Sequence, residues 1–184
     1  MAALLVFTQE EKSRSFWLFI LLTVITGIVV EIIGVNTNLL FGNYTYGNVL
    51  GTKVYNVPIL IGVNWFITIF CAGSIVYRFS QWVLKKFSSE MQPSFAMQLS
   101  SFIIDGAMLA TMFDWVLEPV AIKLGFWQWI PQGQIPVFNF VCWFFISAVL
   151  LTAFRLMKFR KDNLFAVHLF IIQLLFFLVL QTFL

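Results

Sequence analysis

The sequence predicts an all-α, polytopic membrane bundle of about five transmembrane helices in a single domain, residues 1–184. Of its 184 residues, 61% are apolar and only 10% are charged, against roughly 45–50% and about 25% in soluble domains. Its mean hydropathy is +0.94. A soluble fold of this size cannot bury so much apolar surface, so the excess is expected to face lipid.

Five apolar runs are long enough to cross a bilayer, which takes about 20 residues in a helix. The loops at 34–57 and 118–134 fall on one side of the membrane if each run crosses it once. The predicted spans cover residues 16–33, 58–82, 95–117, 135–156 and 164–184.

The distribution of basic residues predicts the orientation. Nine Lys and Arg flank the spans on the side of residues 1–15, whereas only Lys53 and Lys123 lie on the other side. Because basic loops stay in the cytoplasm, we expect a cytoplasmic N-terminus and an outer C-terminus. The net charge of +3 is explained by these basic residues on the cytoplasmic side and requires no nucleic-acid partner.

The two outer loops share an order of motifs. Each carries Gly-x-aromatic-x-aromatic, at 42–46 and 125–129, and each is followed by a Pro with Trp seven residues later, at 58–65 and 136–143. This order suggests a parallel repeat of two helix–loop–helix units plus a C-terminal helix. The alternative is that Gly, Pro and aromatic residues are simply common at membrane interfaces.

Four acids lie within the spans or at their edges. Ionisable groups there are costly, and each is a functional hypothesis by default; the alternative is a structural pair with Asn, Tyr or Arg. The four are Glu31, Asp105, Asp114 and Glu118, whereas Glu10, Glu11, Glu90 and Asp162 are predicted to be solvated.

Asp114 and Glu118 are four residues apart and share a helix face. Pro119 predicts that this helix ends there, where the helix dipole disfavours negative charge. A neutral carboxylic acid is therefore expected at this position. Asp105, nine residues before Asp114, falls on the opposite side of the helix and is assigned to packing or to a relay.

Polar and aromatic residues gather at the depth of these acids, at the outer side. They form a predicted polar cap above an aromatic-rich bundle, which suits acid chemistry on the end of a long apolar molecule. The residues are Asn43, Tyr44, Tyr46, Asn64, Trp65, Trp127, Asn139 and Trp143.

No motif for a cofactor or metal is present in the sequence. Phosphate-binding and dinucleotide-binding Gly loops, the Gly-x-Ser-x-Gly elbow and His-rich boxes are all missing. Cys71 and Cys142 lie in apolar runs without metal-type spacing, and His168 is the one histidine. Acid–base chemistry by Asp, Glu, Tyr and Asn remains, so we expect neither cofactor nor metal.

Two runs together resemble a known family. They read EIIGVNTNLLFGNYTYG at 31–47 with VPILIGVNW at 57–65, and DWVLEPVA at 114–121 with GFWQW at 125–129 and IPVFNFVCW at 135–143. These runs resemble the membrane carotenoid-biosynthesis hydratases of the γ-carotene 1′-hydroxylase and bisanhydrobacterioruberin hydratase type. The similarity covers residues 27–156 and, more loosely, the last span; longer members carry additional spans.

The resemblance implies cofactor-independent addition of water to the terminal double bond of an acyclic carotenoid, in a bacterial or archaeal cytoplasmic membrane. Asp114 or Glu118 would be the acid, and Glu31 with Asn64 or Asn139 would hold the water. The residues of the polar cap would bind substrate. Expected partners are the carotenoid, the bilayer, and a second copy or other carotenoid enzymes.

Other functions fit the same residues. A carotenoid or isoprenoid end-group cyclase or isomerase would use the same proton and cation but exclude water. A non-catalytic carotenoid- or lipid-binding membrane protein would bind pigment unchanged. A transporter is disfavoured because no charged path crosses the centre of the bundle, with Asp105 as the one exception.

Overall fold

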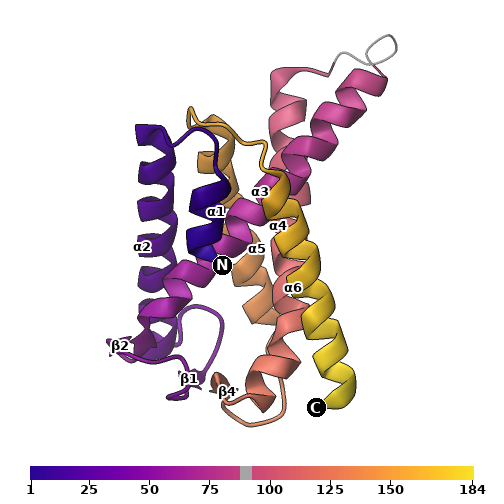
Figure 1. Cartoon of the computed structure of the whole chain (residues 1–184). Coiled ribbons are helices and arrows are strands. Elements are labelled where there is room, and N and C mark those ends of the chain that lie inside the picture. Colours follow the sequence, from indigo (N-terminus) through magenta and orange to yellow (C-terminus); the bar gives the residue numbers. More distant parts are fainter. Residues whose placement is uncertain (88–92) are drawn as a thin grey trace.

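The computed structural model describes residues 1–87 and 93–184 (Figure 1); Glu90, predicted to be solvated, lies outside them. The described residues form six helices and four short strands. These elements are α1 (Ala2–Thr8), α2 (Arg14–Thr37), β1 (Tyr44–Tyr46), β2 (Lys53–Val54), β3 (Val57–Pro58), α3 (Ile59–Lys86), α4 (Phe95–Lys123), β4 (Trp127–Trp129), α5 (Val137–Leu156) and α6 (Leu164–Phe183).

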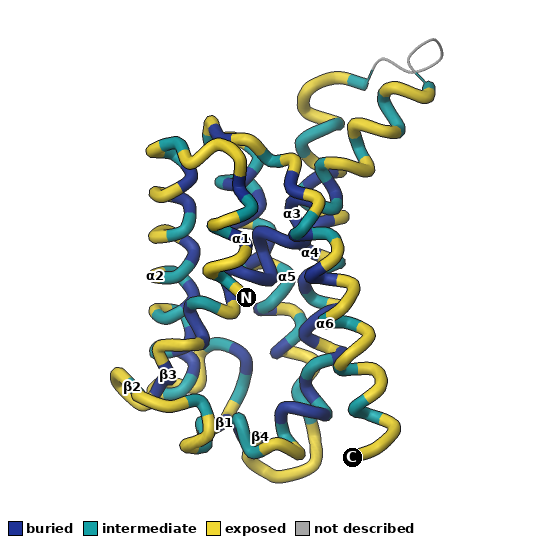
Figure 2. The backbone as a smooth tube through the Cα atoms, viewed as in Figure 1, coloured by how far each residue is buried: buried dark blue, intermediate teal, exposed yellow. Residues whose placement is uncertain are grey.

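The five predicted spans are confirmed. Helices α2 to α6 are each long and apolar enough to cross a membrane, and together they make an all-α membrane bundle. Helix α3 is central and packs against α2, α4, α5 and α6, so it carries much of the buried backbone in Figure 2. Its small residues permit this close packing. At Gly62, for example, an added Cβ would collide with α2, because it would lie 2.6 Å from the Val24 carbonyl oxygen.

Two predicted helix ends were wrong. Helix α2 continues past residue 33, the predicted end of its span, to Thr37, and α4 continues through Pro119 to Lys123. Pro119 has no N–H to donate to the carbonyl four residues earlier, yet the helix is continuous on both sides of it. The chain turns at Gly125, whose φ of +71° is a left-handed conformation that favours glycine. The acids therefore project from within helices rather than from their last residues.

The two loops at one end of the bundle are joined by a β-ribbon that the sequence analysis did not predict. Strand β1 pairs antiparallel with β4, with Tyr44 opposite Trp129 and Tyr46 opposite Trp127. The backbone N–H of Gly47 extends the ribbon by donating to the Phe126 carbonyl at 2.9 Å. We call this paired segment the loop clasp, and the end of the bundle that carries it the cap end. Corresponding segments of the two similar hairpins thus bind each other.

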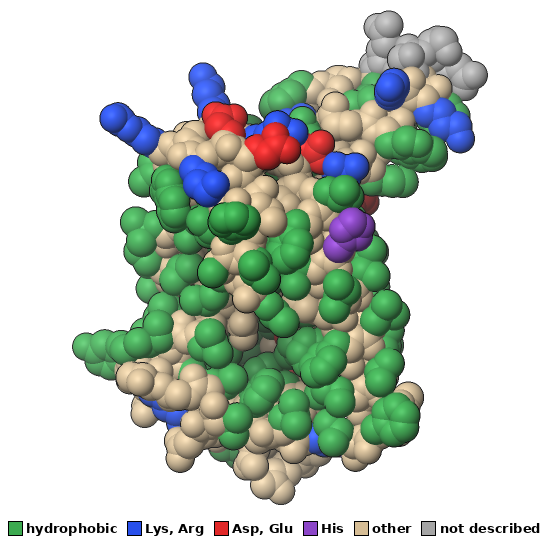
Figure 3. All heavy atoms as spheres, in the orientation of Figure 1, with side chains coloured by type: hydrophobic (Ala, Val, Ile, Leu, Met, Phe, Trp, Pro, Cys, Tyr) green, Lys and Arg blue, Asp and Glu red, His purple; other side chains and the backbone are tan. Residues whose placement is uncertain are grey.

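The opposite end carries the charges. Figure 3 shows most of the Lys, Arg, Asp and Glu side chains of this view gathered there. Exposed ion pairs join Arg78 with Asp162 and Arg160 with Glu10. Helix α1, which the sequence analysis did not predict, turns back from this end into the bundle and packs against α3 and α6, so Met1 lies at mid-depth (Figure 1).

Candidate active site

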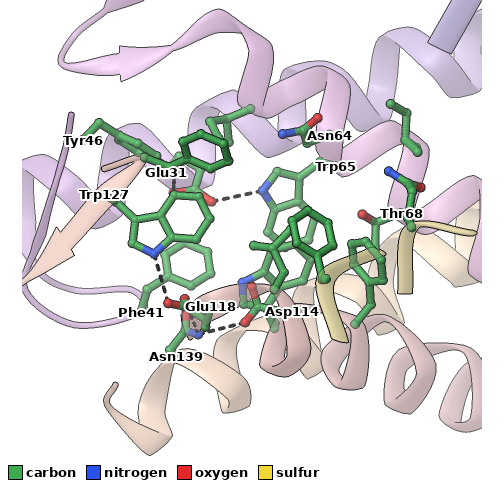
Figure 4. Close-up of a pocket in the computed structure, with 18 of the residues that line it drawn as sticks. Glu31, Phe41, Tyr46, Asn64, Trp65, Thr68, Asp114, Glu118, Trp127 and Asn139 are labelled. Carbon is green, nitrogen blue, oxygen red and sulfur yellow. Dashed lines mark hydrogen bonds between the residues drawn. The ribbon is translucent and has the colours of Figure 1, made fainter. Parts of the chain in front are cut away.

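A cavity of about 320 Å³ lies beside the loop clasp. Figure 4 shows the acids Glu31 and Glu118 with Asn139 at one end and Thr68 at the other. The walls between them are mainly aromatic and aliphatic. The lining includes Glu31, Asp114, Glu118 and Asn139 with Phe41, Tyr44, Tyr46, Trp65, Phe113, Trp127, Trp129 and Trp143. Glu31 therefore shares one enclosure with Asp114 and Glu118, which lie more than eighty residues later in the sequence.

Glu31 is held by three donors. Its Oε2 accepts from the hydroxyls of Tyr44 at 2.5 Å and Tyr46 at 2.7 Å, and its Oε1 accepts from the Trp65 indole N–H at 3.1 Å. Burial, reinforced by Glu31, raises the pKa of Tyr44 and of Tyr46, so both phenols keep the protons that they donate. Three donors occupy most of the roughly four acceptor sites of an ionised carboxylate.

Glu118 is held in the same manner. The indole N–H groups of Trp127 and Trp129 each donate to Oε2 at 3.0 Å, and the Asn139 amide donates to Oε1 at 3.2 Å. An indole nitrogen can only donate, so Oε2 of Glu118 cannot carry a proton toward either ring. The geometry therefore favours the carboxylate form of Glu118.

Asp114 differs from both glutamates. Among the described residues its one recorded hydrogen bond comes from Asn139, whose Nδ2 lies 2.9 Å from Oδ2. The same nitrogen donates to Glu118, so Asn139 links the two acids (Figure 4). A buried carboxyl with one donor, beside a carboxylate with three, is the group best suited to hold a proton.

The two hairpins surround their glutamates with the same kinds of donor, but they differ at the position four residues before the glutamate. Glu31 and Glu118 each accept from two aromatic residues of the adjacent loop and from one residue of the returning helix. Four residues before Glu118 stands Asp114, whereas four residues before Glu31 stands Gly27. A Cβ at Gly27 would lie 2.7 Å from the Trp65 side chain. In the first hairpin, the position that corresponds to Asp114 is thus a glycine, which leaves space for the Trp65 ring in place of a second acid.

Two tryptophans from the returning helices meet in the cavity wall. The rings of Trp65 and Trp143 stack with centroids 3.8 Å apart and planes 7° apart, and both line the cavity. Each stands seven residues after the Pro that precedes its helix, so the stack joins corresponding positions of the two hairpins. Each ring covers one face of the other, so only the outer faces of the stack remain to attract positive charge, such as that of a cationic intermediate.

The other predicted site residues are placed differently. Asn43 is exposed and absent from the lining, and its carbonyl accepts from the Ile130 N–H at 2.8 Å. Asn64 is exposed at the edge of the cavity. Asn139 lies with Asp114 and Glu118, whereas the sequence analysis grouped it with Glu31. Asp105 is exposed on α4 and accepts from the Ser101 hydroxyl at 3.1 Å, on the side predicted for it.

Several lining residues were missed by the sequence analysis. Trp129 follows Trp127 by two residues, and period-two alternation in a strand would have placed both on one face. Phe41 and Phe113 sit in aromatic-rich stretches that carry no distinguishing pattern. Gln173 of α6 also lines the cavity. It could have been predicted as a lining residue because it is a polar side chain within an apolar span.

The hydrogen-bond donors argue against a metal ion bound to Glu31 or Glu118. The oxygens of Glu31 and Glu118 already face N–H and O–H groups, which a metal ion would have to displace. Within residues 1–87 and 93–184, no group of three His, Cys, Asp or Glu side chains is arranged to hold a metal.

The tyrosine donors allow a direct test of the Glu31 site. Replacing both Tyr44 and Tyr46 by Phe is expected to lower the free energy of unfolding by about 1–3 kcal/mol, because a buried acceptor loses its partners. Thermal unfolding in detergent measures the change. Tyr55→Phe is the matched control, since Tyr55 is 76% exposed. Equal stability of the double variant and the control would contradict the assigned role.

Comparison with known proteins identifies the family. The model of one family, described as carotenoid biosynthesis protein, matches residues 1–184, which is the whole chain. Neither the curated proteins nor the solved structures contain a match. The sequence resemblance and the acid-lined apolar cavity agree with the family match. This chain therefore belongs to the carotenoid biosynthesis protein family.

Proposed function

We propose that this protein is a cofactor-independent hydratase that adds water to the terminal double bond of an acyclic carotenoid. The observation that carries the proposal is the asymmetric pair of acids at one end of an apolar cavity. Asp114 has one donor, and Glu118 beside it has three. Such a pair can present one neutral acid and one carboxylate, as addition of water requires.

Protonation is the first step. Asp114 donates its proton to the less substituted carbon of the terminal double bond, and the π electrons form the new C–H bond. The adjacent carbon becomes a tertiary cation. The faces of Trp65 and Trp143 and the carboxylates of Glu31 and Glu118 stabilise this charge. Because the donors hold the carboxylates before reaction, little reorganisation is needed.

Addition of water completes the reaction. The water oxygen forms a bond with the cationic carbon, and Glu118 takes one proton from the attacking water. That proton then passes to Asp114, whose carboxyl shares the Asn139 amide with Glu118. The product is a tertiary alcohol, and the enzyme regains its starting protonation state without any co-reactant.

The orientation of the chain belongs to the proposal. The excess of basic residues at the opposite end of the bundle supports an orientation with the cap end on the outer side of a cytoplasmic membrane. The acids would then lie near the outer water layer, which supplies the second substrate.

Expression in cells that accumulate lycopene tests the reaction. We expect a product heavier by one water, with heavy oxygen incorporated from labelled water and none from labelled molecular oxygen. Mass spectrometry of extracted pigments measures both. A product of unchanged mass but altered absorption would instead indicate an end-group cyclase or isomerase. Unchanged pigment that co-purifies with the protein would indicate a binding protein.

A further inference from the structure

The cavity is not closed on all sides. Two of its lining residues on α6 are largely exposed, Ile172 by 62% and Phe176 by 55%. Across from them, Asn64 of α3 lines the cavity and is also exposed. Exposed residues that also line the cavity mark the part of its wall that is open or one side chain thick, and the cavity is only partly enclosed. The opening therefore lies between α6 and the N-terminal half of α3, and Figure 3 shows the hollow that it leaves, bordered by hydrophobic side chains.

This opening faces the bilayer rather than water. Ile172, Gln173 and Phe176 stand in the middle of α6, a helix that can cross the membrane, and Thr68 stands within α3. Met1, the residue before α1, lines the same cavity, and its sulfur accepts from the Gln173 amide at 3.4 Å. At this depth the surroundings are acyl chains, so an apolar molecule could pass without entering water.

The size of the cavity limits what it can enclose. Its volume of about 320 Å³ is at the lower end of the roughly 300–1,000 Å³ that holds drug-sized ligands. A long polyene does not fit inside such a space, although one branched end of it does. The remainder must extend through the opening.

We infer that the gap between α3 and α6 is a lateral entrance through which a polyene dissolved in the bilayer inserts one end, while the rest of the molecule stays among the lipids. The identity of the ligand rests on the proposed function, whereas the entrance rests on the position of the opening. Recognition would involve the inserted end alone. Side-chain size at Ile172 and Phe176 would then control access to the acids.

Reversible blockage of the entrance tests this inference. Ile172→Cys is labelled in lipid nanodiscs with a bulky aromatic methanethiosulfonate, and Leu175→Cys is labelled in parallel. Leu175 is 55% exposed on the same helix but is not part of the lining. The native Cys71 and Cys142 are buried, and labelled wild-type protein controls for them. Lycopene binding, from the shift of its absorption, and yield of hydrated product are measured separately.

The label at position 172 is expected to weaken lycopene binding at least about tenfold, or 1.4 kcal/mol, and reduction should restore it. The label at position 175 should change binding less than about twofold. Undiminished binding with position 172 labelled, or no lycopene binding by unlabelled protein, would overturn the entrance. Blocked binding in a protein that never hydrates lycopene would leave the entrance standing and refute only the hydratase.

Discussion

Replacement of Asp114 by Asn is expected to slow the proposed hydration by a factor of about 10²–10⁴, the usual contribution of a general acid. The amide has nearly the same shape as the carboxylic acid and can still accept from Asn139, but it cannot protonate an alkene. Folding should be retained, because no buried donor loses its acceptor. Product formation per amount of folded protein, measured by mass spectrometry, gives the factor.

The same helix offers a matched control for this substitution. Asp105→Asn makes the identical chemical change at an exposed position whose hydrogen bond is to Ser101, and hydration should change less than about twofold, within the range expected of surface substitutions. Full activity of the Asp114→Asn variant would refute the assigned acid. If Asp114→Asn kept its activity while a folded Glu118→Gln variant lost it, the acid role would pass to Glu118.

Replacement of Gly47 by Ala is expected to open the loop clasp. The added Cβ would lie 2.0 Å from the carbonyl oxygen of Gly125, a backbone atom that cannot rotate away. The strain should separate β1 from β4 and lower the free energy of unfolding by about 1–3 kcal/mol, as overpacking does. Because β1 carries two of the three donors of Glu31 and β4 two of the three donors of Glu118, the proposed hydration should fall together with stability.

Thr45→Ala provides the comparison for the clasp. Thr45 is the exposed middle residue of β1, and its truncation leaves the pairing with β4 intact. Thermal unfolding and product yield of the two variants are compared side by side. A Gly47→Ala protein as stable and active as Thr45→Ala would show that the clasp does not position the acids.

The sequence by itself determined the class of the fold. Spans such as Ile59–Lys86 were predictable because the bilayer demands long apolar runs whose backbone is satisfied within a helix. The acids were predictable candidates for a similar reason, since Asp114 and Glu118 stand out in an apolar span. The motif shared by the two outer loops also pointed to the segments that form the loop clasp.

Only the tertiary structure decided how these parts act together. The continuation of α4 through Pro119 depends on neighbours that a local rule does not include. The donors of Glu31 come from a separate loop and helix, and the pairing of β1 with β4 joins segments about eighty residues apart at one edge of the cavity. Hydrogen bonds are short-range and directional. For that reason the number of donors at each acid, which separates Asp114 from Glu31 and Glu118, exists only after the chain has folded.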